Sequence, residues 1–175
     1  MPRSHAKPPD GICCGSPKTC RHQFRGECRV MTEQAFKTND VVSFIDEPLV
    51  LVNSEDQEMG FMPKVDCHLG DGTLHRAFSL FVFNRQGEVL LQQRQADKML
   101  WPLYWSNTCC SHPREGEDMA QATQRRLTEE LGLSCDLHYL YKFEYQEKFE
   151  DVGSEHELCS VYIGFSDAPV IANET

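Results

Sequence analysis

Positive charge is scarce in this chain of 175 residues: 17 Lys and Arg stand against 27 Asp and Glu, and the formal net charge is −10. Proteins that bind nucleic acids or anionic membranes generally need an excess of cations to neutralise phosphates. A small anionic substrate needs only a local cluster of cations. Long hydrophobic runs are also missing, since no stretch approaches the roughly 20 apolar residues that span a bilayer. The sequence therefore predicts one globular domain with no nucleic-acid partner and no membrane contact.

No secretory signal is visible, because no apolar stretch follows the basic residues among the first ten. The nine cysteines, an odd number, are therefore expected as reduced thiols in the cytoplasm. Four of them lie with His22 in a polar leader that lacks the paired CxxC spacing of structural zinc sites. This spacing favours a disordered tail over a zinc knot. We expect a disordered leader over residues 1–40 and a monomeric folded domain over residues 46–175.

The pattern of apolar residues indicates an α+β fold with a mixed β-sheet core and one central helix. The helix is expected over about residues 118–131, with Ala120, Thr123, Leu127 and Leu131 facing the core and Gly132 ending it. The expected strands cover residues 48–52, 58–62, 77–83, 88–94, 137–145 and 158–165. Strands 77–83 and 88–94 flank a turn and should form a hairpin.

Three histidines, His68, His75 and His112, lie near predicted strand ends. They could converge on a metal ion, for which histidine is the commonest side-chain ligand, or they could be unrelated loop residues. Glu155 and Glu157 are two residues apart in a strand and share a face. Such a pair suits a metal bridge or an acid–base pair as well as a solvated strand entry.

Two adjacent cysteines precede His112, and in an extended segment their side chains point to opposite faces. One of them could therefore face a site and be activated by a nearby cation or metal. The alternative is a buried, inert thiol, the usual state of a free cysteine.

Residues 111–133 resemble the Nudix box, G-x5-E-x7-R-E-U-x-E-E-x-G-U, in which U is aliphatic. The matching positions are Glu117, Arg125, Leu127, Glu129, Glu130, Gly132 and Leu133. Ser111 replaces the first glycine and Arg126 replaces a glutamate, so part of the metal-binding set of a Nudix hydrolase is missing. Arg126 could instead form an i,i+4 ion pair with Glu130 on an exposed helix face or contact a diphosphate.

The chain from about residue 49 to 170 resembles the type 1 isopentenyl-diphosphate isomerases, a family with the Nudix fold. The segments that carry the resemblance are Cys67-His68, Leu74–Ser79, Gln92–Arg94 with Lys98, Asn107–Pro113, Arg125-Arg126, Glu129–Gly132 and Glu155–Glu157. The resemblance implies interconversion of isopentenyl and dimethylallyl diphosphate through a tertiary carbocation. Alternatives are a Nudix-type diphosphate hydrolase or a catalytically impaired diphosphate-binding fragment.

The resemblance also implies roles for individual residues. Cys110 and Glu157, assisted by Tyr145, would be the two catalytic groups. One divalent ion, Mn²⁺, Mg²⁺ or Zn²⁺, would be held by His68, His75, His112, Glu155 and Glu157. A Mg²⁺ ion would link the substrate diphosphate to Glu130 and the carbonyl of Cys110. The remaining diphosphate contacts would be Lys64, Arg94, Lys98, Ser111 and Arg126.

Members of this family usually continue beyond the Nudix core with a tryptophan-containing segment that covers the pocket. In this chain both tryptophans, Trp101 and Trp105, precede Cys110, and the sequence ends at Thr175. The resemblance therefore leads us to expect a domain that is truncated at its C-terminus.

Overall fold

The computed structural model describes residue 44 and residues 46–173; the predicted leader over residues 1–40 lies outside them. Its first elements are β1 (Pro48–Val52), β2 (Glu58–Pro63), α1 (Lys64–Cys67), β3 (His75–Phe83) and β4 (Gln92–Gln93). These are followed by β5 (Trp105–Ser106), β6 (Cys109–Ser111), α2 (Met119–Leu131), β7 (Leu137–Phe149) and β8 (Gly153–Phe165). Among the described residues, no helix has the length and apolar character that crossing a membrane requires.

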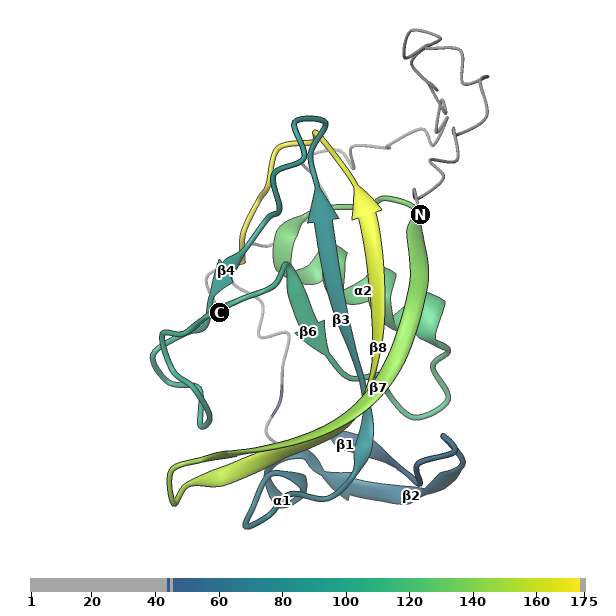
Figure 1. Ribbon diagram of the computed structural model, residues 1–175, viewed down its shortest axis with the longest axis vertical. Helices are drawn as coiled ribbons and strands as arrows, with labels where there is room; N and C mark the ends of the chain where they lie inside the picture. The colour runs from purple at the N-terminus through teal and green to yellow at the C-terminus, as the bar shows by residue number, and fades with distance from the viewer. Residues whose placement is uncertain (1–43, 45, 174–175) are drawn as a thin grey trace, which may run out of the picture.

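Strands β2, β1, β3, β8 and β7 lie side by side in this order, and β6 also pairs with β3. The sheet is mixed, because β3 runs parallel to β8 while its pairings with β1 and β6 are antiparallel. Figure 1 shows β7 and β8 as long, curved strands and α2 behind the sheet. The predicted α+β class with a mixed sheet and a central helix is confirmed.

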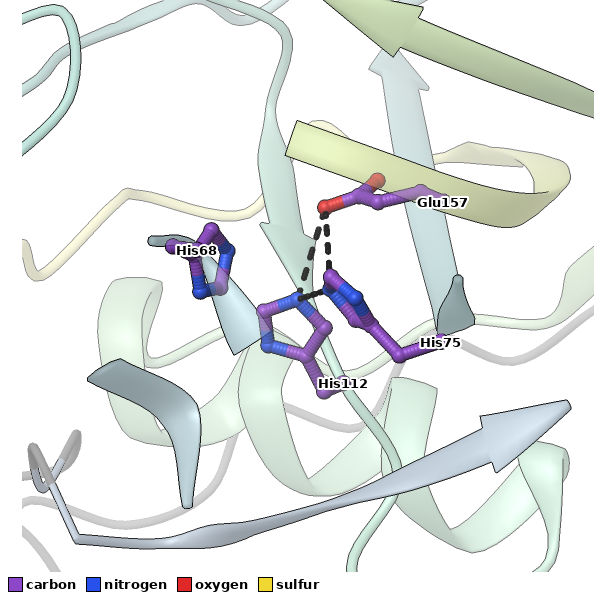
Figure 2. A group of neighbouring side chains, drawn as sticks. All are labelled: His68, His75, His112 and Glu157. Atoms are coloured by element: carbon purple, nitrogen blue, oxygen red, sulfur yellow. Dashed lines mark hydrogen bonds and ion pairs between the residues drawn. The ribbon is translucent and has the colours of Figure 1, made fainter. Parts of the chain in front are cut away.

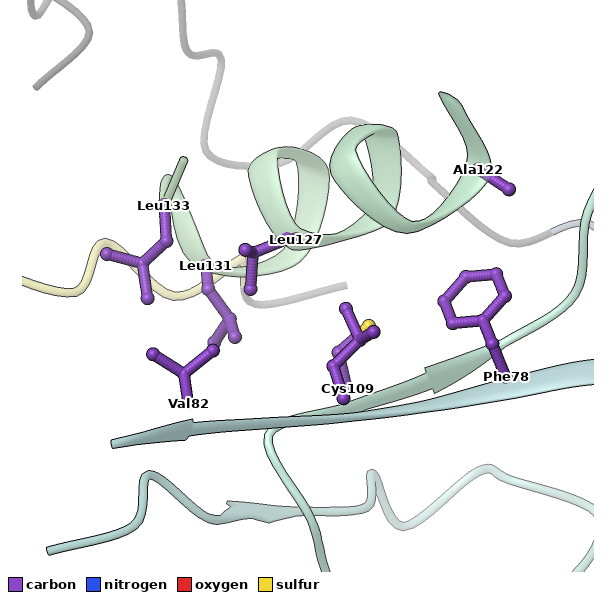
Figure 3. Close-up of a cluster of buried hydrophobic side chains, with 8 residues drawn as sticks. Phe78, Val82, Cys109, Ala122, Leu127, Leu131 and Leu133 are labelled. Carbon is purple, nitrogen blue, oxygen red and sulfur yellow. The ribbon is translucent and has the colours of Figure 1, made fainter. Parts of the chain in front are cut away.

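The main core lies between α2 and one face of the sheet (Figure 3). The side chains of Phe78, Leu80 and Val82 alternate along β3 and point toward the helix. The predicted helix is confirmed, with Asp118 as its N-cap and Gly132 in the left-handed conformation at its end. Ala120 was wrongly assigned to the core: it is exposed, and Ala122 is buried instead. The buried face of α2 includes Ala122 and Arg126, so it is rotated relative to the predicted face. Ala120 therefore lies outside it, on the solvent side.

The predicted hairpin forms only next to its turn. Phe83 forms an isolated β-bridge with Val89. Of the strand expected over 88–94, only Gln92 and Gln93 form a β-strand, and this strand pairs with β5 in a separate sheet. The expected strand was wrong because β6 pairs with the edge of β3 that it would need. The Thr108 hydroxyl also lies between the two segments: it accepts a hydrogen bond from Val82 N at 2.8 Å and donates one to Leu90 O at 2.7 Å.

Candidate active site and metal centre

Four potential metal-binding side chains meet at one end of the sheet, although they come from distant parts of the chain. His68 follows α1, His75 begins β3, His112 follows β6 and Glu157 lies in β8. One ligand atom from each lies within 4.8 Å of the others, and Figure 2 shows the side chains pointing toward one another. The Nε2 atoms of His75 and His112 are 3.2 Å apart, and Glu157 Oε1 lies 3.4 Å from His112 Nε2. The three histidines that the sequence singled out therefore converge.

The backbone explains this convergence. His75 and Glu157 are direct partners in the parallel β3–β8 pairing. His68 reaches the same place because its carbonyl oxygen accepts a hydrogen bond from Ser154 N at 2.9 Å, next to Gly153 in β8. A Cβ atom at Gly153 would collide with this oxygen, so the close approach of His68 requires glycine.

The ring nitrogens on the outer side of two histidines face backbone carbonyls. His68 Nδ1 lies 2.6 Å from Lys64 O, and His75 Nδ1 lies 2.7 Å from Thr73 O. A carbonyl oxygen can only accept, so each Nδ1 carries the proton and each Nε2 keeps a free lone pair. Burial and the nearby His112 lower the pKa of His75 to about 3, and burial holds the pKa of His112 well below its usual range. Neutral imidazoles are the metal-binding form, so this donor set fits a divalent ion.

Glu155 is not part of the group that converges within 4.8 Å. It is connected to the group through Tyr145, whose hydroxyl oxygen lies 2.9 Å from an oxygen of Glu155 and 2.9 Å from an oxygen of Glu157. Burial and the charge of Glu157 raise the pKa of Glu155, whereas the Tyr145 hydrogen bond opposes this shift. The two carboxyl groups therefore share one hydrogen-bond donor on the same side of β8.

Cys109 and Cys110 point to opposite faces of β6, as the alternation predicts. Cys109 is buried in the core beneath α2, whereas Cys110 is exposed on the other face. The Cys110 thiol lies 2.6 Å from Asn107 Oδ1, 3.3 Å from Ser79 Oγ and 3.7 Å from Ser106 Oγ. Although its side chain is exposed, loss of water around the sulfur raises the pKa of Cys110, and the charge of Glu157 adds to this effect.

Cys110 and Glu157 lie on the same face of the sheet. Ser79 is the partner of Cys110 in the β3–β6 pairing, and its hydroxyl oxygen also accepts a hydrogen bond from the Cys159 thiol at 3.4 Å. Cys159 is two residues from Glu157 in β8, so their side chains share this face. The face that carries the metal-binding group therefore also carries the exposed thiol.

Four predicted phosphate-binding cations, Lys64, Arg94, Lys98 and Arg126, lie within electrostatic range of this site. Burial and the charges of Lys98 and Arg126 lower the pKa of Lys64 to about 8. Besides burial, the charges of Lys64, Arg126 and Arg94 lower the pKa of His112. The acidic chain therefore concentrates positive charge here, although Arg94 also donates two hydrogen bonds to Leu100 O. Ser111 ends β6, where it pairs with Phe78.

The charged residues of the Nudix box, which lie in α2 and in the loop before it, divide into two groups. Glu117 and Glu129 both pair with Arg125, and these residues line a shallow depression of about 760 Å³ away from the histidines. Arg126 contacts Glu129 and forms a close ion pair with Glu130. This i,i+4 pair was one of the two predicted alternatives, but it lies on a buried helix face and not on an exposed one. Glu130 also accepts a hydrogen bond from Gln92 at 3.1 Å.

Sequence reasoning assigned no role to Asn107, Ser79 or Ser106, the three polar neighbours of the Cys110 thiol. Asn107 and Ser79 do lie within the segments that carry the family resemblance, but nothing in their spacing indicates that they contact Cys110. Their proximity follows from the pairing of β6 with β3.

Comparison with known proteins agrees with this geometry. Residues 73–174 match the family model described as the NUDIX domain. Over 129 residues the chain is 50% identical to isopentenyl-diphosphate Delta-isomerase 1 of Photorhabdus laumondii subsp. laumondii. The aligned residues cover 73% of each protein. Over 126 residues it is 42% identical to isopentenyl-diphosphate Delta-isomerase of Burkholderia multivorans, covering 72% of this chain and 71% of the relative. The crystal structure of DR0079 from Deinococcus radiodurans shares the fold, with a TM-score of 0.58 at 24% identity over 73% of this chain and 76% of that chain.

Proposed function

We propose an activity from the premise that this chain belongs to the type 1 isopentenyl-diphosphate isomerases of the Nudix fold. It interconverts isopentenyl diphosphate and dimethylallyl diphosphate, a step of isoprenoid biosynthesis. Its reaction is the migration of a carbon–carbon double bond by addition of one proton and removal of another.

The observation that carries the mechanism is the common face of Cys110 and Glu157. An unactivated alkene is a weak base, and its protonation produces a tertiary carbocation. Such a reaction needs a well-placed acid and a base that removes the allylic proton. The Cys110 thiol and the Glu157 carboxyl group, with Tyr145 as its hydrogen-bond donor, would supply these two functions. The contacts of Ser79 Oγ with the Cys110 thiol and with the thiol of Cys159, two residues from Glu157, support their common location.

One divalent ion would be held by His68, His75, His112 and Glu157. Glu155 would either be a further ligand or contact the site indirectly, through its hydrogen bond with Tyr145. Mn²⁺, Mg²⁺ and Zn²⁺ are the candidates, because imidazole and carboxylate ligands suit all three to different degrees. When bound, the ion polarises the Glu157 carboxyl group and influences its protonation. The hydrogen bond from Tyr145 orients the same carboxyl group from the other side.

The cation cluster would bind the diphosphate. Lys64, Arg94, Lys98, Ser111 and Arg126 would contact its oxygens, with charge-assisted hydrogen bonds from the basic residues. Glu130 and the carbonyl oxygen of Cys110 would hold a Mg²⁺ ion that accompanies the diphosphate. Arg126 is paired with Glu129 and Glu130, so on binding the diphosphate it would exchange these partners for phosphate oxygens.

We further propose that the enzyme is a cytoplasmic monomer without nucleic-acid or membrane partners. The described cysteines support a reducing compartment, since Cys67, Cys109, Cys110, Cys135 and Cys159 are all free thiols. The small-molecule substrate is the one partner that the site requires.

Hydrolysis of a diphosphate, the Nudix alternative, is less well supported. A guanidinium at position 126 stands where the Nudix box has a carboxylate, so one carboxylate of the hydrolase's metal-binding set is missing. A hydrolase would release phosphate or pyrophosphate, whereas an isomerase leaves the diphosphate intact.

The direct test is incubation with isopentenyl diphosphate and Mg²⁺ in deuterated water. An isomerase produces dimethylallyl diphosphate that carries deuterium from the solvent. Phosphate release without isomerisation would indicate the hydrolase. Binding of the substrate without turnover would indicate the impaired diphosphate-binding fragment.

The adjacent cysteines provide a matched pair of variants for the same assay. We expect Cys110→Ala to abolish isomerisation, because it removes a group that exchanges protons with the substrate. Cys109→Ala should retain activity and instead lower the free energy of unfolding by about 1–2 kcal/mol, because it removes a buried core side chain. The reverse result would show that the wrong sulfur has been assigned.

A further inference from the structure

We propose that Asn107 and Ser79 are positioning residues that hold the Cys110 thiol from two sides. This inference rests on the proposed function, because it gives the two residues a role through the catalytic thiol. The argument depends on the hydrogen bonds around the sulfur, which determine the orientation of each group.

The carboxamide of Asn107 is oriented by the backbone. Its Nδ2 atom donates to Leu80 O at 3.0 Å and to Cys109 O at 3.2 Å. Both partners are carbonyl oxygens that can only accept, so the amide nitrogen must face them. The other end of the amide, Oδ1, is therefore directed at Cys110 Sγ, which lies 2.6 Å away.

The orientation of the amide decides the direction of the other hydrogen bonds. Oδ1 can only accept, so the proton of the Cys110 thiol points toward Asn107. The thiol has no second proton to donate, so the Ser79 hydroxyl must be the donor to the Cys110 sulfur, 3.3 Å away. The Ser106 hydroxyl instead donates to Asn107 Oδ1 at 3.1 Å. The oxygen of Ser79 in turn accepts from the Cys159 thiol at 3.4 Å. A single direction of donation runs from Cys159 through Ser79 and Cys110 to Asn107.

The two positioning residues are themselves attached to a buried part of the sheet. Leu80 and Cys109, whose carbonyls hold Asn107, are buried partners in the β3–β6 pairing. Ser79 is the neighbouring residue of β3 and the direct partner of Cys110. The side chain of Cys110 is exposed, so packing alone does not hold it. The hydrogen bonds to Asn107 and Ser79 connect the exposed sulfur to this buried framework.

The test compares Asn107→Ala and Ser79→Ala with the parent chain in the isomerase assay. A displacement of a catalytic group by about 1 Å can cost about 100-fold in rate. We expect kcat to fall about tenfold or more in Asn107→Ala and by a smaller factor in Ser79→Ala, with KM changed less than about twofold. Asn84→Ala is the matched control: this amide also binds backbone groups, at the distant turn between β3 and β4, and its loss should leave kcat unchanged.

A second readout does not depend on turnover. The rate at which iodoacetamide alkylates Cys110, followed by mass spectrometry, should change about threefold or more in Asn107→Ala, while the rate at Cys135 stays constant. If the parent chain does not isomerise, the proposed function fails, but the alkylation rates still decide whether Asn107 holds Cys110. If Cys110→Ala is inactive while both positioning variants keep parental kcat and alkylation rates, this inference is wrong and the proposed function stands. Should Asn107→Ala fail to fold, Ser79→Ala decides in the same way.

Discussion

Tyr145 has a single phenolic proton, yet its oxygen lies 2.9 Å from an oxygen of both Glu155 and Glu157. One proton satisfies only one of these acceptors at a time. The second contact becomes favourable when one carboxyl group is protonated and donates to the phenol oxygen. The raised pKa of Glu155 is consistent with such a shared proton. The Tyr145 hydroxyl therefore links the Glu155 carboxyl group to Glu157, the proposed acid–base residue.

At the residue scale, we therefore predict that Tyr145→Phe lowers kcat about tenfold to 100-fold and leaves KM nearly unchanged. The ring stacks on Phe143 at a centroid distance of 5.5 Å, and the substitution keeps this contact, so the thermal midpoint should barely change. Tyr141→Phe is the control: Tyr141 lies four residues away on the same strand, and its exposed hydroxyl is distant from both glutamates in the register. Equal activity of the two variants in steady-state assays would argue against a role for the Tyr145 hydroxyl.

The charged side chains of α2 form two neighbouring groups on its surface. Arg126 pairs with Glu130 in the proposed diphosphate site, whereas Arg125 connects the helix to the preceding loop. Arg125 donates to Glu117 Oε1 at 2.7 Å, to Glu117 Oε2 at 2.8 Å and to the carbonyl oxygen of His112 at 3.4 Å. Through these bonds, the arginine of the Nudix box holds the loop that carries His112. This part of the box therefore supports the position of His112 in the candidate metal-binding group.

At this element scale we predict that Glu117→Gln lowers the free energy of unfolding by about 1–3 kcal/mol at neutral pH. Hydrogen bonds from Arg125 lower the pKa of Glu117 below its usual value of 4.5. The stability that this shift contributes is fully present above pH 4.5 and is lost as the pH falls through the lower pKa of the folded state. Denaturant titrations of parent and variant should therefore converge at acidic pH.

Glu115→Gln is the matched control for this comparison. Glu115 is exposed and lies only two residues from Glu117. Its substitution should change the unfolding free energy by less than about 0.5 kcal/mol at any pH. A difference for Glu117→Gln that persists unchanged at acidic pH would contradict the ion-pair explanation.

At the scale of the whole molecule, the candidate metal-binding group brings together distant segments of the chain. The ligands follow α1 and β6 or lie in β3 and β8, so a bound ion would link segments that are up to 89 residues apart in sequence, from His68 to Glu157. A ligand that binds only the folded state stabilises it by mass action. Removal of the ion should therefore affect the stability of the entire domain and not only its activity.

At this scale we predict that a chelator lowers the thermal midpoint by several degrees and that Mn²⁺ or Zn²⁺ restores it. Gly153→Ala should weaken this response, because the added Cβ displaces the carbonyl of His68 and with it one ligand. His138→Ala removes an exposed histidine outside the site and should respond to metal like the parent. A midpoint of the parent that does not depend on metal would contradict a structural contribution of the centre.

The sequence by itself determined the helix over 119–131, most of the strands and the family, because these depend on local periodicity, capping residues and contiguous motifs. It also singled out His68, His75, His112 and Glu157 by residue type. The tertiary structure decided what depends on pairing between distant segments. Only β6 inserted beside β3 explains why the expected strand over 88–94 is interrupted and why Asn107 and Ser79 meet the Cys110 thiol. Local sequence does not specify which edge of a strand is occupied, since that choice is made by competition between segments far apart in the chain.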